Sequence, residues 1–583
     1  MKRSANRGGG GGGGGKRGYK SRGNKKRSAK SNNNNGWGPD AGNSWKKKRR
    51  TTPAPLPTKK ERRLQRSHGV VVEEAKVMWN KARNKATSKS EKSKVVDSIM
   101  EKLGEALSDI ATRHDSARVI QFCVQFGSEK HRVTIVNALK PRVVELCKMT
   151  HGRFVVQKLF DYCKQEDSRR PLLKALERHV VALSVHSTGA LVLEHLFLKS
   201  LSTKEQRWLF QEFYGPEFKH FKREKRGTLS EILSDEPKKR DDILSNLTNI
   251  SEKHAEKGLL SMSFVQELLA NLFEHADYKA ALRMLPYVKE VAPALCSTRK
   301  GVVALVFCIA YGSAKDRKRI IKCFKDDLFK DNEAGLAEHP FAHLALVKLL
   351  DVMDDTKLIT KHVLSGVLGH LERACDSLYA RKLLLHVLTP KSSKYFAPSD
   401  ISLLEKRFRV SEDGEKIETS KKDAETRQGE LLKFCHERLE AHCESNVTAM
   451  LNRTYAKDVL VETMAQWKTS SLVESVANAA VSIVEDDEES TPILNNVGHR
   501  TLQRLIQHDG TTMFAPKLVE AMKKSEGGVS FWAKKSNRSA FVVLALLKNA
   551  STSSVVRASL TKKDLSGTGA SGAGLKALLS ALD

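Results

Sequence analysis

The sequence predicts an all-α protein, an α-solenoid of about eleven stacked helical repeats. Apolar residues recur at three- and four-residue spacing over most of the chain from about residue 70, for example in segment 153–163. We find no sustained period-two alternation of the kind that half-buried strands show, and aromatic residues make up only 6% of the 583 positions. Hydrophobic residues make up 40%, which is enough for a sizeable core. The prediction is therefore helical throughout.

An internal repeat of about 36 residues explains how so many helices could pack. Segments 115–121, 150–157 and 187–194 align, and their final residues lie 36 and 37 positions apart. Weaker copies open at 263–268, 299–307, 341–346, 379–385, 455–461, 498–503, 537–543 and 572–578. A unit of this length cannot close its own core, so we expect the repeats to stack on their neighbours.

Changes in composition divide the chain into four predicted parts. They are a disordered basic Gly/Asn-rich tail at 1–69, N-terminal repeats at 70–255, central repeats at 256–400 and divergent C-terminal repeats at 401–583. Two charged segments in the last part, 411–427 and 485–489, are predicted as exposed insertions. Basic clusters interrupt the repeat between residues 199 and 255, where we expect the array to bend into two arms.

The predicted tail carries more than half of the excess positive charge. Residues 1–66 hold 21 Lys and Arg against two acidic residues, a net charge of +19 out of +33 for the chain. This segment has eight consecutive glycines and few apolar residues, so burial cannot offset its chain entropy and it should be disordered. Its basic clusters predict nuclear import and non-specific RNA affinity, with a merely solubilising tail as the alternative. The import residues are Lys46, Lys47, Lys48, Arg49, Arg50, Lys59, Lys60, Arg62 and Arg63.

The excess of basic residues favours a polyanionic partner, with nucleic acid ahead of an anionic membrane. The longest apolar run, 302–311, has ten residues, whereas a spanning helix needs about 20. No apolar segment follows the first basic residues as it would in a secretory signal. The nine cysteines form no CxxC pair, and several sit among apolar neighbours. They are predicted to be reduced core residues of a cytosolic or nuclear protein.

Motifs that could indicate an enzyme are weak. Segment 567–572 fits GxGxxG, but it follows no strand and only eleven residues come after it. Cys435, His436, His442 and Cys443 share one predicted helix. Cys435 and His442 lie seven residues apart, about 10 Å along the helix axis, so the four side chains cannot converge on one zinc ion. We therefore predict no catalytic residues, no metal and no cofactor.

Five stretches carry a resemblance to a known family. They are 114–121, 312–322 (GSAKDRKRIIK), 354–358 (DDTKL), 380–390 (ARKLLLHVLTP) and 421–432 (KKDAETRQGELL). Over about residues 70–583 the chain resembles the nucleolar Pumilio-like proteins of the Penguin or Puf-A type. The resemblance implies Pumilio repeats with the family's C-terminal domain, and a place in the nucleus and nucleolus. It also implies a role in pre-rRNA processing and large ribosomal subunit assembly, with RNA bound at low sequence specificity. Expected further partners are DNA and pre-ribosomal particle proteins, no membrane is expected, and the chain is expected to be a monomer.

The resemblance also implies which side chains face RNA. In a Pumilio repeat, positions one and five of the second helix reach the base edge and position two stacks on bases. These trios are Ala117, Arg118 and Gln121, then Arg153, Phe154 and Gln157, then Ala190, Leu191 and Glu194. The fifth position is apolar in later copies, at Val306, Leu346 and Leu384. Base reading is therefore expected to be degraded. The predicted RNA contacts here are Arg118, Gln121, Arg153, Phe154, Gln157 and Lys158, with a structural role as the alternative for Arg118 and Gln121.

A basic stripe supplies a second predicted contact with RNA. Lys315, Lys318, Arg319 and Lys322 share one helix face, opposite Ile320 and Ile321. Such a stripe could neutralise phosphates whatever the sequence, although a solvated face is the alternative. Two other functions stay open: a sequence-selective messenger-RNA regulator of translation, and a protein-binding helical scaffold.

Overall fold

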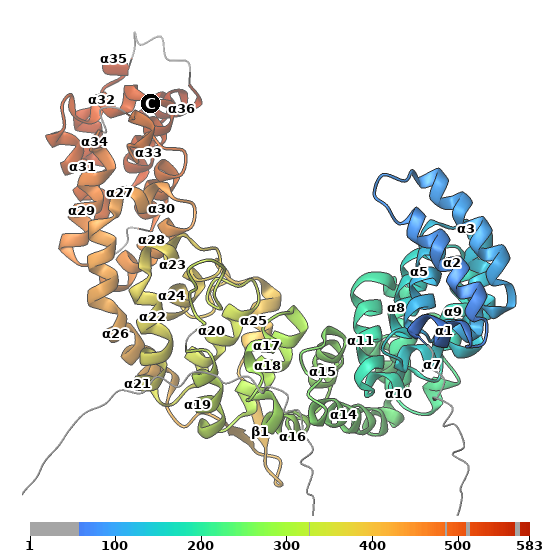
Figure 1. The fold of residues 1–583 in the computed structure, drawn as a ribbon. Helices are drawn as coiled ribbons and strands as arrows, with labels where there is room; N and C mark the ends of the chain where they lie inside the picture. Colours follow the sequence, from blue (N-terminus) through green and yellow to red (C-terminus); the bar gives the residue numbers. More distant parts are fainter. Residues whose placement is uncertain (1–57, 326, 484–486, 509–512, 566–571, 583) are drawn as a thin grey trace, which may run out of the picture. The chain divides into compact units, whose positions relative to one another are not determined.

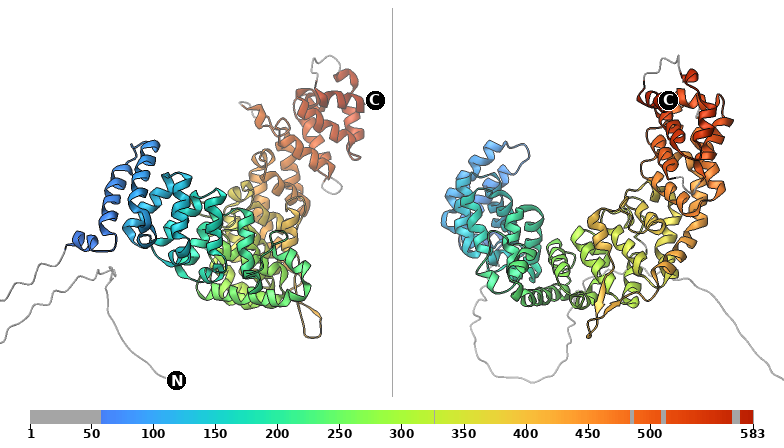
Figure 2. Two further views of the ribbon diagram at one scale, coloured as in Figure 1. Left: turned by 90° about the vertical axis from the view of Figure 1, so that its right-hand side faces the viewer. Right: turned by 180° about the vertical axis from the view of Figure 1, so that it is seen from behind.

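The structure is a computed structural model that describes residues 58–325, 327–483, 487–508, 513–565 and 572–582. The chain divides into two compact units, Met1–Arg62 and Arg63–Asp583. The first import cluster, at 46–50, and most of the predicted tail lie outside the described residues. The second unit is an array of helices that follow one another in sequence order, as the colours in Figure 2 show. The predicted all-α solenoid is confirmed.

Eleven helices of the described residues form a continuous row in which each contacts the next (Figure 1). We call it the inner row. It consists of α5 (His114–Phe126), α8 (Gly152–Tyr162), α11 (Ser187–His195), α15 (Ser263–His275), α18 (Arg299–Tyr311), α20 (Ala342–Val352), α24 (Arg381–Leu388), α28 (Ala456–Trp467), α30 (Gly498–Gln507), α33 (Asn537–Lys548) and α36 (Ala573–Ala581). The row matches the predicted number of repeats.

Short helices and longer second helices complete the repeats. Short helices before inner-row helices are α4 (Leu107–Ile110), α7 (Val143–Lys148), α10 (Val180–Ser184), α17 (Ala292–Leu295), α23 (Leu371–Asp376), α27 (Val447–Asn452) and α32 (Gly528–Lys535). Second helices after them, which we call the outer helices, include α6 (Glu129–Leu139), α9 (Glu166–Leu176), α12 (Thr203–Phe210), α16 (Tyr278–Val288), α19 (Ala314–Cys323), α26 (Ala424–Ser445), α29 (Ser470–Val481), α31 (Phe514–Lys524) and α34 (Ser553–Ser559). A typical repeat is therefore a three-helix unit.

The remaining elements flank or interrupt the repeats. They are α1 (Lys59–Leu64), α2 (Gly69–Ala82), α3 (Lys89–Leu103), α13 (Leu229–Asp235), α14 (Arg240–Glu256), α21 (Thr356–Ile359), α22 (Ser365–Gly369), α25 (Pro398–Leu404), α35 (Lys562–Leu565) and the strands β1 (Phe408–Val410) and β2 (Lys416–Glu418). None of the helices in the described ranges is long and apolar enough to cross a membrane. All nine cysteines are free, and eight are buried, as predicted for core residues.

Glycine lies at the start of several inner-row helices because the preceding backbone passes very close. A Cβ atom added at Gly301 would lie 2.2 Å from the Leu295 carbonyl oxygen, and one at Gly498 would lie 2.3 Å from that of Pro492. In the first repeat Ser116 occupies this position and donates from Oγ to the Ile110 carbonyl oxygen. The small residue thus lets the short helix and the inner helix turn tightly on each other.

Replacing Gly301 with alanine is expected to lower the free energy of unfolding by about 1–3 kcal/mol, because the new methyl group overlaps a backbone carbonyl. Gly429→Ala is the matched control. Gly429 lies inside α26 with no heavy atom within 4 Å of an added Cβ, so alanine should stabilise that helix by about 0.5–1 kcal/mol. Urea denaturation of the full chain measures both. Equal effects of the two substitutions would contradict the packing argument.

An inserted segment separates the third and fourth repeats of the inner row. Residues 196–262 contribute α12, α13 and α14, yet α11 still contacts α15 directly. Glu194 on α11 makes the join, since its carboxylate accepts from Ser263 N at 2.9 Å, from Ser263 Oγ and from Phe264 N at 3.4 Å. The bend expected between 199 and 255 stays a prediction.

Two predictions about irregular segments were wrong in part. Residues 59–64 form α1 inside the segment predicted to be disordered up to residue 69, because Thr58 and Glu61 cap one another at its start. Residues 411–427 are not simply an exposed insertion: β1 pairs antiparallel with β2, and Arg427 is 5% exposed. Part of the acidic segment 485–489 lies outside the described residues, while Glu488 pairs with Lys535 at 2.6 Å.

Buried arginines attach segment 411–427 to the neighbouring helices. Arg317 of α19 donates from Nε to the Ile309 carbonyl at 2.9 Å, and from Nη1 to those of Val352 at 2.8 Å and Thr419 at 3.2 Å. Arg427 donates to the carbonyls of Met353 and Asp351 at 3.1 and 2.5 Å. Arg317 thus binds the carboxyl ends of α18 and α20, and Arg427 binds that of α20, where helix dipoles are negative. Burial lowers the pKa of Arg317 to about 10, so it stays charged at neutral pH.

Candidate nucleic-acid interface

The predicted RNA-facing residues of the first repeats lie on three consecutive inner-row helices. Position two is exposed in each, at Arg118 on α5, Phe154 on α8 and Leu191 on α11. Phe154 is 42% exposed and Leu191 40%, which is unusual for large apolar side chains in a well-packed helix. We call the predicted set, together with Leu191, the N-terminal strip. Its members are Arg118, Gln121, Arg153, Phe154, Gln157, Lys158 and Leu191.

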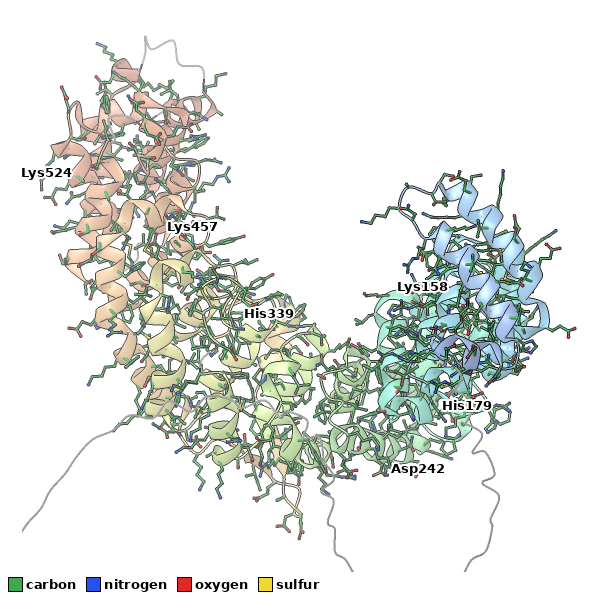
Figure 3. All side chains as sticks on the ribbon, in the orientation of Figure 1. Lys158, His179, Asp242, His339, Lys457 and Lys524 are labelled. Carbon is green, nitrogen blue, oxygen red and sulfur yellow. The ribbon has the colours of Figure 1, made fainter. Side chains whose placement is uncertain are left out.

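The second repeat supplies the stacking surface of the N-terminal strip. The Arg153 guanidinium lies 4.5 Å from the centre of the Phe154 ring. Lys158, labelled in Figure 3, lies 5.0 Å from the Tyr162 ring and donates to Gln125 Oε1 at 3.4 Å. An exposed aromatic ring flanked by cations can stack on a base while the cations bind phosphates.

The cations of the N-terminal strip are not neutralised by carboxylates. Within the described residues, Arg118, Arg153 and Lys158 form no salt bridge, and Arg153 Nε has no hydrogen-bond partner. Asp161, the acid nearest to Lys158 in sequence, is engaged by His195 at 2.9 Å and Ser200 at 2.5 Å. Burial would raise the pKa of Asp161, but its hydrogen bonds with Ser200 and His195 hold the pKa below its ordinary value, with smaller contributions from the charges of His195 and Lys158. The strip therefore presents positive charge to a ligand.

Most side chains at positions one and five, which would contact base edges, are buried or already hydrogen-bonded. Ala117 and Ala190, at position one, are buried, and Gln157 donates to the Leu191 carbonyl at 3.4 Å. Glu194, at position five of the third repeat, is occupied by the start of α15. The sequence could not show this last contact because Glu194 and Ser263 are 69 residues apart. Among the position-five side chains of these repeats, only that of Gln121 makes no hydrogen bond in the described part of the chain.

The central inner-row helices are covered by a segment of the chain itself. Val306, Leu346 and Leu384, the apolar fifth positions, are fully buried. The cover is residues 396–419, which we call the strap; it contains α25 and the β1–β2 hairpin. Its contacts on α18 include the ion pair of Asp400 with Arg299 at 2.7 Å and the Arg407 guanidinium over the Phe307 ring at 3.8 Å. A ligand cannot reach these helix faces while the strap is in place.

Lys348 on α20 is buried by the strap. Its side chain is fully buried, and Nζ donates to the Leu404 and Glu405 carbonyls at 3.0 and 2.9 Å. Burial lowers the pKa of Lys348 to about 8, partly offset by Asp351. This lysine binds the strap and is not exposed to a ligand.

The predicted basic stripe lies on α19, an outer helix, and is not brought together with the N-terminal strip. Lys315, Lys318 and Lys322 are exposed, while Ile320 and Ile321 are buried on the opposite side. Arg319 pairs with Glu290 at 2.7 Å, and that hydrogen bond raises its pKa. Three of the four predicted cations thus have no carboxylate partner within the described residues.

The Cys and His residues of α26 take part in helix packing. Cys435 and Cys443 are buried along this single helix, and the His436 ring stacks on Trp467 at 4.5 Å. Across the described residues, no group of three or more His, Cys, Asp or Glu side chains is placed to hold a metal ion. The GxGxxG segment, apart from Gly572, lies outside the described residues.

Comparison with known proteins identifies the repeats. The Pumilio-family RNA binding repeat matches residues 118–140, 142–176 and 179–213, and the CPL (NUC119) domain matches residues 376–515. The chain is a Pumilio-repeat protein with a CPL domain. The N-terminal strip falls within the matched Pumilio repeats, and the strap falls within the CPL domain. The predicted family resemblance is confirmed.

The chain is similar to several proteins over most of their length. The Schizosaccharomyces pombe protein "Pumilio homology domain family member 6" is 28% identical over 510 residues, covering 85% of this chain and 77% of the relative. "Pumilio homolog 3" of Homo sapiens is 26% identical over 492 residues, covering 82% and 74%. The crystal structure of human Puf-A has a TM-score of 0.74 and 25% identity, covering 88% of this chain and all of that one. A second structure, human Puf-A in complex with DNA, matches with a TM-score of 0.75 and 24% identity and shows the same fold.

Proposed function

We propose that this Pumilio-repeat protein binds single-stranded RNA with little sequence preference, and that it acts in pre-rRNA processing and large ribosomal subunit assembly in the nucleolus. One observation carries the binding mode: the N-terminal strip combines cations that form no salt bridge in the described residues with an exposed Phe154, whose ring lies 4.5 Å from the Arg153 guanidinium, while most base-edge side chains are buried or occupied. Phosphate contacts and stacking give affinity without discrimination between bases.

Two further features support low specificity. The strap contacts α18, α20 and α24, so the inner row cannot read a long series of bases one per repeat. Human Puf-A has been crystallised with DNA, which shares the phosphate backbone but lacks the 2′-hydroxyl of RNA. The exposed lysines of α19 offer a second phosphate-binding surface. The nucleolar role rests on the family resemblance, and the absence of catalysis stays a prediction.

Crosslinking of the full chain to RNA in growing cells, followed by sequencing of the bound RNA, tests the proposed role. We expect pre-rRNA to dominate the crosslinked reads without a shared short motif. We also expect staining of the protein in cells to locate it in the nucleolus. A majority of reads from messenger-RNA untranslated regions with one common motif would instead support the translational regulator. Recovery of protein partners without RNA would support the scaffold.

A further inference from the structure

A cavity of about 490 Å³ opens beside the irregular segment that joins α12 to α13. Its walls include the turn between α9 and α10, the side chain of Trp208 on α12 and residues 217–223 of the joining segment. His179, in that turn, and Lys158 of the N-terminal strip lie on different sides of these repeats (Figure 3). A partner bound in this cavity would therefore leave the N-terminal strip free for RNA.

A buried carboxylate holds two walls of this cavity in place. Glu212 is fully buried, and it accepts from the backbone N–H groups of Arg178 at 2.7 Å and Val180 at 3.0 Å in the turn. It also accepts from Lys222 Nζ at 2.7 Å in the joining segment. Arg178 has a φ of 69°, a left-handed conformation that residues other than glycine rarely adopt, and its bond to Glu212 helps to hold it there. Both walls are therefore fixed without a ligand.

The carboxylates that line the cavity are bound by donors of the chain itself. Glu177 accepts from Trp208 Nε1 at 2.8 Å. Glu217 pairs with Lys239 at 2.8 Å, and Glu236 pairs with the same lysine at 2.6 Å. These acidic side chains therefore have little capacity left to attract a cationic ligand.

The charges that remain free in the cavity are positive. Arg178 and Lys219 line it, and neither side chain forms a salt bridge or a hydrogen bond within the described residues. Phe221 lies beside them and is 75% exposed, the largest exposed fraction of any large hydrophobic side chain in the described part of the protein. We call Arg178, Lys219 and Phe221 the loop surface. Unpaired cations next to an exposed apolar ring indicate a ligand that carries both anionic and apolar groups.

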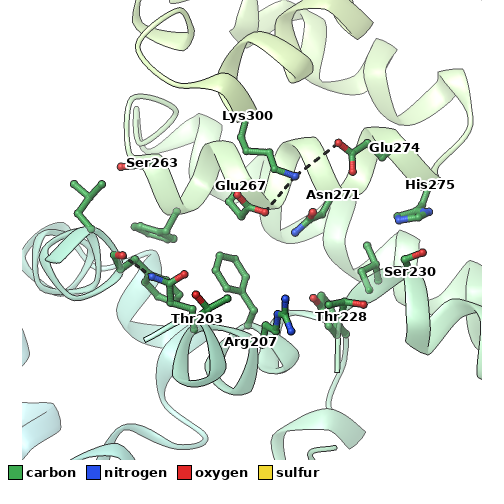
Figure 4. A pocket seen from close by; sticks show the side chains of 17 residues that line it. Thr203, Arg207, Thr228, Ser230, Ser263, Glu267, Asn271, Glu274, His275 and Lys300 are labelled. Carbon is green, nitrogen blue, oxygen red and sulfur yellow. Dashed lines mark hydrogen bonds and ion pairs between the residues drawn. The ribbon is translucent and has the colours of Figure 1, made fainter. Parts of the chain in front are cut away.

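A neighbouring cavity between α12 and α15 has no excess of positive charge (Figure 4). Two cations and two carboxylates line it, namely Arg207, Lys300, Glu267 and Glu274. Lys300 Nζ lies 3.4 Å from the Glu267 carboxylate and 3.7 Å from that of Glu274. An anionic ligand therefore gains more at the loop surface than in this neighbouring cavity.

The loop surface suits a peptide better than a nucleic-acid strand. A strand brings a phosphate at every nucleotide, and proteins that bind it line a groove with successive cations. Here Glu177 directly precedes Arg178 in the wall of the cavity, and Glu217 lies two residues before Lys219. A continuous phosphate backbone would approach these carboxylates. A peptide can instead place single carboxylates against the cations and one apolar side chain against Phe221.

We propose that the loop surface is a docking site for an acidic segment of a partner protein, with one aromatic side chain among its carboxylates. The carboxylates pair with Arg178 and Lys219, and the aromatic ring packs on Phe221. Opposite charges make the two surfaces complementary, and the cavity has room for a large side chain. This function goes beyond RNA binding and does not depend on it.

Binding of a labelled acidic peptide to the full chain tests the docking site. The probe is a fluorescein-labelled peptide of sequence GEDEFEDEG, and the comparison peptide has alanine in place of its phenylalanine. Packing the phenyl ring on Phe221 removes apolar surface from water, so the phenylalanine peptide should bind about tenfold more tightly at equal salt. The two peptides carry the same charge, so non-specific attraction to this basic chain affects both equally.

Two variants of equal charge change locate the binding. The loop variant carries Arg178→Gln, Lys219→Gln and Phe221→Ala, and it should bind both peptides equally. The matched control variant carries Lys433→Gln, Phe434→Ala and Lys523→Gln. These residues are exposed on α26 and α31, and Phe434 is itself 40% exposed. The control variant should keep the full preference for the phenylalanine peptide.

The outcomes separate the docking site from the proposed RNA binding. Equal binding of the two peptides by the unchanged chain overturns the docking site, and so does a preference that survives in the loop variant. A labelled oligouridylate, measured in parallel, should bind the loop variant as tightly as the unchanged chain. A loss of about tenfold for oligouridylate would show that the loop surface binds RNA and would overturn the acidic partner. None of these results removes the RNA contacts proposed for the N-terminal strip.

Discussion

Replacing Arg317 with methionine is expected to lower the free energy of unfolding by about 3–5 kcal/mol, the largest stability effect of any single substitution considered. Arg317 is fully buried and binds carbonyl oxygens of Ile309, Val352 and Thr419. Methionine fills similar space but offers no donor, so these carbonyls would be left buried without partners. The strap should detach, because the bond from Arg317 to Thr419 is one of the contacts that hold it.

Arg319→Met is the matched control for Arg317→Met. Arg319 lies two residues along the same helix in an exposed pair with Glu290, and such pairs contribute about 0–1 kcal/mol. Urea denaturation measures the stability of both variants, and hydrogen exchange at residues 408–419 reports on the strap. If Arg317→Met unfolded at the same urea concentration as Arg319→Met, the buried arginine would not hold the strap.

Reversing the charge of the N-terminal strip is expected to weaken RNA binding by about 100-fold or more at 0.1 M salt. The variant is Arg118→Glu, Arg153→Glu and Lys158→Glu. All three side chains lie on inner-row helices and form no salt bridge in the described residues. The substitutions should therefore lower RNA affinity more than folding stability. Fluorescence anisotropy with a labelled single-stranded RNA measures the affinity.

The matched control variant carries Lys433→Glu, Lys468→Glu and Lys523→Glu. It changes the net charge by the same amount as the variant of the N-terminal strip. These lysines are exposed on α26, at the end of α28 and on α31, outside the first repeats. This control should lose far less affinity. A third variant, Lys315→Glu, Lys318→Glu and Lys322→Glu, measures what the stripe on α19 adds. Equal losses in all three variants would mean that overall charge, and not the strip, binds RNA.

The repeat architecture was predictable because its signals are local. Apolar spacing marks each helix, and the small residue before each trio recurs at Ser116, Gly152 and Gly189. The strap was not predictable, because its contacts join residues far apart in sequence: Thr419 Oγ1 donates to the Ala310 carbonyl 109 residues away. Charge alone made residues 411–427 look like an exposed insertion, whereas helix-end carbonyls bind the buried Arg427.

One unused signal in the sequence does report on these contacts. Arg132, Arg169, Arg317 and Arg427 each lie four residues after the residue that precedes an outer helix, at Ser128, Gln165, Ser313 and Asp423. Each binds a carbonyl at the end of an inner helix, as Arg132 does with Val124 at 3.0 Å and Arg169 with Phe160 at 2.7 Å. Arginine at this position therefore indicates packing. The predicted RNA contacts of the N-terminal strip stay predictions until binding is measured.

The salt dependence of RNA affinity tests the central claim most directly. The full chain is titrated with several unrelated single-stranded RNAs, one duplex and a DNA of matched length over a series of salt concentrations. Phosphate-dominated binding predicts similar affinities for the single strands and a steep slope, and the charge-reversed strip should flatten that slope by about 2, since each lost contact removes about 0.7. One RNA preferred a hundredfold or more, with a shallow slope, would contradict the account and show that these repeats read bases.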